Sequence, residues 1–138
     1  MYAHGMVAPV LALVAWTLVM WLWMYVTRIP AMQAANVDLD EVSRTGKLPD
    51  LPPKVARVAA NYNHLHEQPT VFYALALASH LATPADGVAI GLAWTYVLLR
   101  IVHSLIQATI NKIPLRFTVF TLGTLILVAL LIRTVWML

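Results

Sequence analysis

The sequence predicts an all-α integral membrane protein, a bundle of four helices that each cross the bilayer. Of its 138 residues, 61% are hydrophobic and only 11% are charged, and the mean hydropathy is +0.76. These values are far from the averages of soluble domains. Four apolar stretches reach the roughly 20 helical residues that cross about 30 Å of hydrocarbon. The expected helices of this single transmembrane domain, residues 1–138, are 6–27, 53–81, 88–110 and 114–137.

The first predicted helix carries no charge from residue 6 to residue 27. No basic region precedes its apolar run, so we interpret it as a retained helix and not as a cleaved signal peptide. Pro30 lacks a backbone donor and is expected to end it. Arg28, at that end, is either an ordinary interfacial cation or, beside a cavity, a group that holds an anionic ligand.

Residues 28–52 form the one long polar connection and are predicted to be a solvent-exposed loop. Asp38 is a candidate N-cap for a short helix that ends at Gly46. Pro53 then suits the first turn of the second helix, where a missing N–H group costs little.

The second predicted helix contains a cluster of polar side chains where a membrane helix is normally apolar. A buried charge alone costs roughly 2.5–3.5 kcal/mol on insertion scales. At 100° per residue these side chains gather on one side of the helix, and Pro69 is expected to kink it. The interpretation that needs no ligand is a hydrogen-bond network that fixes helix packing. The number of polar groups favours a cavity instead; those on this side are Arg57, Asn61, Asn63, His64, Glu67 and Gln68, whereas His66 lies on the other side.

A second polar stripe follows the third helix, where Arg100, His103 and Gln107 recur at helical spacing. Arg116 lies in the first turn of the fourth helix. Glu67 and Arg100 are expected at the same depth, each compensating the other. The predicted cavity is lined by Arg57, Asn61, Asn63, His64, Glu67, Arg100, His103, Gln107 and Arg116.

The distribution of basic residues predicts the orientation in the membrane. The connections 28–57 and 111–116 hold seven Lys and Arg, whereas the turn 83–87 and the N-terminal tail hold none. Both termini should therefore lie outside the cytoplasm, with the cavity open to it. A net charge of +3 with dispersed basic residues disfavours nucleic-acid binding. No metal site is expected, because His64 and His66 lie on nearly opposite sides of a helix.

Two segments resemble the family of membrane-associated proteins in eicosanoid and glutathione metabolism (MAPEG). NHLHEQPTVFYALAL, residues 63–77, is similar to the family's Asn and Glu signature of the second helix, with altered spacing. RIVHSLIQATINKIPLR, residues 100–116, is similar without gaps to the Arg, His and closing Arg of the prostaglandin synthase branch. The resemblance covers roughly residues 54–138 and is strongest to a bacterial branch.

The resemblance implies a homotrimeric four-helix bundle in a bacterial inner membrane, both termini periplasmic, that binds glutathione between subunits. Asn63, Glu67 and Arg100 match positions that hold glutathione, and Arg57 lies near one that faces its carboxylate. Arg116 matches the arginine that stabilises the thiolate, in agreement with the cation that a thiolate needs. The remaining candidate ligand-binding residues for glutathione are Arg28, Asn61, His64, His103 and Gln107.

Three positions depart from the family pattern, since Gln107, Phe117 and Phe120 replace residues with hydroxyl groups. Three functions therefore remain open. The first is a glutathione transferase or peroxidase that acts on lipophilic electrophiles. The second is a non-enzymatic protein that binds a lipid or a partner, which the missing hydroxyl groups favour. The third is a proton-coupled exporter that uses Glu67, although its first helix carries no acid.

Overall fold

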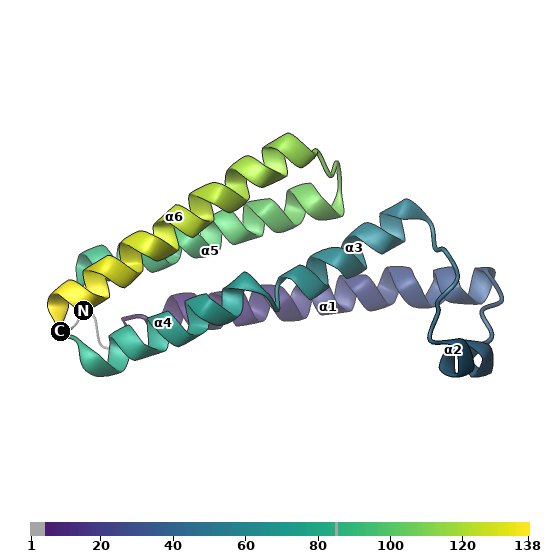
Figure 1. Cartoon of the computed structure of the whole chain (residues 1–138), viewed down its shortest axis with the longest axis horizontal. Helices are drawn as coiled ribbons and strands as arrows, with labels where there is room; N and C mark the ends of the chain where they lie inside the picture. The colour runs from purple at the N-terminus through teal and green to yellow at the C-terminus, as the bar shows by residue number, and fades with distance from the viewer. Residues whose placement is uncertain (1–4, 85) are drawn as a thin grey trace.

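The computed structural model describes residues 5–84 and 86–138, and these residues form helices joined by short connections (Figure 1). Three helices, α1, α5 and α6, are long and apolar enough to cross a membrane. The all-helical class is confirmed for this part of the chain. The helices are α1 (Val7–Ala34), α2 (Leu39–Thr45), α3 (Pro53–His64), α4 (Gln68–Ala82), α5 (Gly87–Ala108) and α6 (Ile113–Met137).

The long helices form two groups. α5 packs along α6, and α1 packs along α3 and, further on, along α4. Figure 1 shows the two chain ends and the α4–α5 turn at one end of the molecule, and α2 and the α5–α6 turn toward the other. In this view the α5–α6 hairpin diverges from α1 toward the end that carries α2, whereas Arg57 on α3 still bonds Thr109 at the end of α5. The connections with most of the basic residues thus lie at the end that carries α2.

Helix α1 continues through Pro30 to Ala34, so the prediction that Pro30 ends it is wrong. Pro30 is exposed near the end of the helix, where the loss of one backbone hydrogen bond is tolerated. The helix ends instead in a Schellman motif at Asn36, whose φ is +50°. There the Asn36 N–H donates to Gln33 O at 3.1 Å and the Val37 N–H to Met32 O at 3.1 Å.

The short helix α2 follows the sequence prediction. Asp38 Oδ1 accepts hydrogen bonds from the N–H groups of Asp40 at 3.0 Å and Glu41 at 3.4 Å. Gly46, with φ +71°, ends the helix in the left-handed region that glycine tolerates best.

The second predicted helix, residues 53–81, is broken into α3 and α4, a correction to the single kinked span. Pro69 stands in the first turn of α4, where it has no N–H to donate to the carbonyl of Leu65. The break is closed by tighter bonds, from the His66 N–H to Asn63 O at 3.0 Å and from the Glu67 N–H to His64 O at 3.1 Å. Neither half is long enough to span a membrane alone. The fourth crossing therefore stays a prediction.

A buried polar relay fixes α4 against α5 and α6. Tyr96 on α5 donates its hydroxyl to Gln68 Oε1 at 3.1 Å. Gln68 at the start of α4 donates to Thr124 Oγ1 on α6 at 2.7 Å. The Tyr96 ring stacks on Phe72, with centroids 4.7 Å apart. An added Cβ at Gly123 would lie 3.6 Å from the Tyr96 ring, an ordinary contact distance, so α6 passes directly beside this ring.

At the end of the bundle that carries the two chain ends, an ion pair joins the start of α5 to the end of α6. Arg133 Nε donates to Asp86 Oδ2 at 2.7 Å and Arg133 Nη2 to Asp86 Oδ1 at 3.2 Å. Asp86 Oδ1 also accepts from the Val88 N–H at 3.2 Å and caps α5. The sequence analysis did not single out this pair.

The Asp86 pair predicts a specific loss of stability in acid. Hydrogen bonds from Arg133 lower the pKa of Asp86 below its usual value. The unfolded chain then takes up the proton first, so the stabilisation is complete above about pH 4 and is lost as the pH falls through the lowered pKa. We expect Asp86→Asn to melt a few degrees below the wild type at neutral pH, with the gap closing in acid. Thermal unfolding in detergent across a pH series measures this.

Asp40→Asn on exposed α2 is the matched control and should leave the melting temperature unchanged throughout. The difference in melting temperature between Asp86→Asn and the wild type should shrink in acid. If it stays constant down to the lowest pH, the charge of Asp86 does not contribute to stability.

Candidate functional site

The candidate site lies where α3, α5 and α6 approach one another near the α5–α6 turn. A pocket of about 210 Å³ there is lined by His64, His103, Ile113, Arg116, Phe117 and Phe120. The His64 and His103 ring centroids are 5.0 Å apart, and Phe120 lies 5.5 Å from His64. Three of the predicted site residues, one from each of these helices, therefore share one pocket.

Arg116 is held at the edge of this pocket by the turn that precedes α6. Its Nη1 donates to Asn111 Oδ1 at 2.6 Å. Asn111 itself has a φ of +50° and closes α5, with its N–H donating to Ile106 O at 2.7 Å. The Asn-Lys-Ile-Pro turn thus orients the guanidinium, which is only partly buried and remains able to contact a ligand.

A row of buried polar side chains without partners runs along α5. Arg100 is 1% exposed, and its three guanidinium nitrogens make no hydrogen bond within the described residues. A buried charge without a partner is strongly unfavourable, so these groups require a ligand, ordered water or another chain. Four other buried side chains on α3 and α5 have a polar atom that makes no hydrogen bond within the described residues. They are Asn61, His103, Ser104 and Gln107.

Glu67 does not compensate Arg100, and this part of the prediction is wrong for the single chain. The Glu67 side chain is 67% exposed, and its Oε2 lies 3.0 Å from His64 Nδ1. No ion pair joins it to Arg100 in the part of the chain that the structure describes. Glu67 lies in the break between α3 and α4, so the continuous helix from which its position beside Arg100 was predicted is absent there.

The remaining candidates lie apart from this pocket. Arg28 and Asn63 line a separate pocket of about 360 Å³ between α1, the chain around Asp50 and α3. Arg57 Nη1 donates to Thr109 O at 3.0 Å, where it caps the end of α5. The ten predicted site residues thus fall into four groups. His64, His103 and Arg116 line the His64 pocket, and Asn61, Arg100 and Gln107 belong to the buried row on α3 and α5. Arg28 and Asn63 line the Arg28 pocket, whereas Arg57 bonds Thr109 and Glu67 bonds His64.

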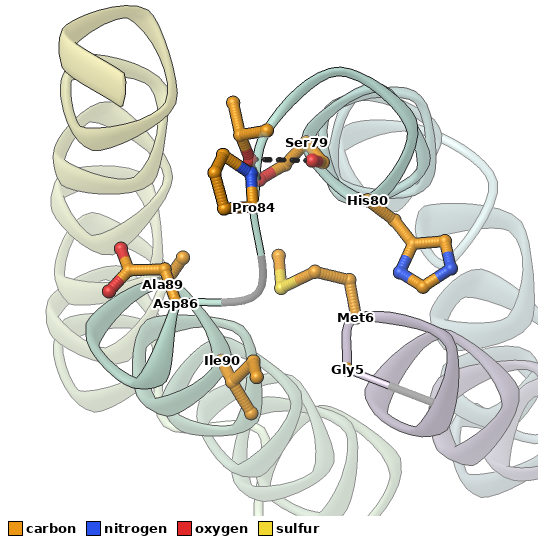
Figure 2. A pocket seen from close by; sticks show the side chains of 9 residues that line it. Gly5, Met6, Ser79, His80, Pro84, Asp86, Ala89 and Ile90 are labelled. Atoms are coloured by element: carbon orange, nitrogen blue, oxygen red, sulfur yellow. Dashed lines mark hydrogen bonds between the residues drawn. The ribbon is translucent and has the colours of Figure 1, made fainter. Parts of the chain in front are cut away.

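A third pocket, shown in Figure 2, lies at the end that carries the termini. It measures about 80 Å³ and is lined in part by Met6, Ser79, His80 and Ile90. Two of its polar side chains are already engaged, since Thr83 Oγ1 donates to Ser79 O at 2.7 Å and Asp86 binds Arg133. None of the predicted site residues lines it, so we do not assign it to the site.

The relay of Tyr96, Gln68 and Thr124 is the part of the site's surroundings that sequence reasoning missed. Thr124 gives no signal, because a threonine in an apolar helix commonly bonds its own backbone, as it does here to Phe120 O at 3.0 Å. No three His, Asp or Glu side chains within residues 5–84 and 86–138 converge to hold a metal ion.

These features define an integral membrane protein of apolar helices with a polar site at one end of the bundle. The model of the MAPEG family matches residues 6–136, and the chain belongs to that family. Searches of curated proteins and of solved structures found no match. The resemblance predicted from residues 54–138 therefore extends over nearly the whole chain.

Proposed function

We propose that the protein binds glutathione and uses it, as a transferase or peroxidase, against lipophilic electrophiles that arrive from the bilayer. The observation that carries the proposal is the fully buried Arg100 with three unpartnered nitrogens. Buried polar groups are almost always satisfied, so the row on α5 is suited to a polar ligand. Membership of a family that includes glutathione-dependent enzymes supports this ligand.

The donor set fits a tripeptide with two carboxylates, an ammonium group and amides. Arg100 is suited to a carboxylate, which it binds through paired N–H groups. Asn61 has both its amide nitrogen and its amide oxygen free, and Gln107 its amide oxygen. These atoms can pair with peptide groups. When bound, glutathione supplies a thiol whose deprotonated form is the nucleophile.

Arg116 is the catalytic cation in this proposal. It lines the pocket beside two phenylalanines, whose apolar rings lower the local polarity. A positive charge stabilises a thiolate more strongly in these surroundings than in water. The apolar rings of Phe117 and Phe120 are suited to a lipophilic acceptor.

The site is completed by a second copy of the chain in the proposed homotrimer. The His64 pocket, at about 210 Å³, is smaller than the roughly 300 Å³ at which ligand pockets typically begin. Glu67 is exposed although it lies within the second predicted span, and a carboxylate facing lipid is costly. A neighbouring subunit that covers Glu67, Asn63 and Arg57 accounts for both observations. Asn63, Arg57 and Arg28 are then available to the ligand.

In the proposed orientation α3 and α4 together make the fourth crossing of a bacterial inner membrane. The end that carries α2 and the α5–α6 turn faces the cytoplasm, and both termini face the periplasm. The excess of basic residues in the connections at that end supports this arrangement.

A titration with glutathione tests the proposal. We expect millimolar glutathione to raise the melting temperature of the detergent-solubilised protein by mass action, and S-methylglutathione to do so as well, because the carboxylates supply most of the binding. With chlorodinitrobenzene as acceptor, glutathione alone should support turnover, which absorbance measures.

The absence of both responses would reject the proposal. If the protein instead retains lipid tightly, the alternative of a non-enzymatic lipid- or partner-binding protein is favoured. The phenylalanines at positions 117 and 120, which replace hydroxyl groups, are the observation that supports this alternative.

A further inference from the structure

His64 and Glu67 form a hydrogen-bonded pair at the break between α3 and α4. His64 Nδ1 lies 3.0 Å from Glu67 Oε2. An ionised carboxylate only accepts hydrogen bonds, so Nδ1 carries the proton and Nε2 is left with a free lone pair. Nε2 makes no hydrogen bond within the described residues, and the His64 side chain lines the pocket that also contains Arg116.

We propose that His64 Nε2 is the base that takes the proton from the ligand thiol, with Glu67 as a positioning residue that fixes the tautomer. This inference rests on the proposed function and adds a residue role to it. The S–H bond breaks, its proton moves to Nε2, and the electron pair stays on sulfur, where the positive charge of Arg116 stabilises it. The products are an imidazolium and a thiolate of equal and opposite charge.

The charges around His64 favour the imidazolium only when the thiolate is also present. The His103 ring on α5 lies beside His64. The positive charges of Arg100 on α5 and Arg116 on α6 also act on His64, whereas Glu67 on the adjoining turn is the nearby acid. The two cations oppose an isolated imidazolium, and Glu67 offsets them. A thiolate in the same pocket adds a second negative charge, so proton transfer from the thiol is coupled to ligand binding.

His103 is the competing candidate for this role, and its surroundings disfavour it. It is 2% exposed, and its Nδ1 makes no hydrogen bond with residues 5–84 or 86–138. No carboxylate among those residues lies within hydrogen-bond distance to orient the His103 ring or to stabilise its protonated form. Burial without such a partner favours a neutral imidazole. His64, half-buried and bonded to Glu67, therefore suits the base.

The assignment also explains how the site works without the hydroxyl groups that positions 107, 117 and 120 lack. A base is needed because Arg116 stabilises a thiolate but does not accept a proton. The break at residues 65–67 places Glu67 next to His64 and not next to Asn63, so the acid that the resemblance assigns to glutathione is already engaged by the base.

The test uses the full-length protein in detergent with glutathione, and compares wild type with His64→Gln. We expect His64→Gln to bind S-methylglutathione as the wild type does. Thiolate formation, followed by ultraviolet absorbance, should release no proton to the buffer in the wild type at neutral pH, because His64 keeps it. In His64→Gln each thiolate should release a proton, and turnover should fall about a hundredfold, a usual contribution of general base catalysis.

In Glu67→Gln, a fraction of the thiolate formed should release its proton to the buffer, because an amide does not hold the His64 tautomer as a carboxylate does. His66→Gln is the matched control. His66 lies two residues away, is exposed, and bonds Tyr62 O at 2.9 Å outside the pocket. It should behave as the wild type in proton release and turnover.

The outcomes separate this inference from the proposed function. Wild-type protein that binds neither glutathione nor S-methylglutathione overturns both. Wild-type protein that binds glutathione, together with His64→Gln that keeps the wild-type turnover and releases no proton, overturns the role of His64 alone.

Discussion

Replacement of Arg116 by alanine is expected to lower glutathione-dependent turnover about 10²- to 10³-fold, the usual cost of removing one group that stabilises developing charge. Arg116 is oriented by Asn111 and lines the pocket with His64. The variant should still bind S-methylglutathione, because Arg100 supplies the proposed carboxylate contact. Arg116→Lys, which keeps a charge but not the fork of N–H groups, should recover part of the rate.

Lys112→Ala is the control for this experiment. Lys112 is an exposed cation in the same turn, at the N-cap of α6, and it does not line the pocket. It should leave turnover unchanged. Turnover in Arg116→Ala equal to that of Lys112→Ala would remove Arg116 from the mechanism.

Replacement of Arg100 by methionine is expected to abolish the response to glutathione without destabilising the free protein. The arginine makes no hydrogen bond within the described residues, so its removal relieves a buried, unpaired charge. Affinity for glutathione should fall by about 2 kcal/mol or more, roughly thirtyfold, because the ligand carboxylate loses its partner. Thermal unfolding with and without glutathione measures both effects.

Arg133→Met is the matched arginine control and should behave in the opposite way. Arg133 binds Asp86 at the far end of the bundle. Its loss should lower the melting temperature of the free protein and leave the shift induced by glutathione intact. A large destabilisation of free Arg100→Met would instead show that Arg100 has a structural partner.

Much of the fold follows from composition and helical spacing. The long apolar runs predict α1, α5 and α6, and the spacing of Arg100, His103 and Gln107 places all three on one buried face of α5, as the structure shows. Asp38 and Gly46 bound α2 as expected, because capping depends on nearby residues.

The parts that sequence reasoning missed depend on local breaks and on long-range contacts. Pro69 was expected to kink one helix, but it separates two, and Glu67 in the break pairs with His64 and not with Arg100. Helical periodicity does not continue across such a break. The pairing of Asp86 with Arg133 joins residues 47 positions apart in the sequence, which no periodic pattern relates.

The division of the second span affects how the chain enters the bilayer during its synthesis. α3 has 12 residues and α4 has 15, so neither half offers the insertion machinery a complete apolar segment. α5 and α6 are synthesised later and are each long and apolar enough to cross a membrane. The polar relay from Gln68 to Tyr96 and Thr124 forms only after they emerge. We therefore expect α5 and α6, in the second half of the chain, to hold α3 and α4 in place.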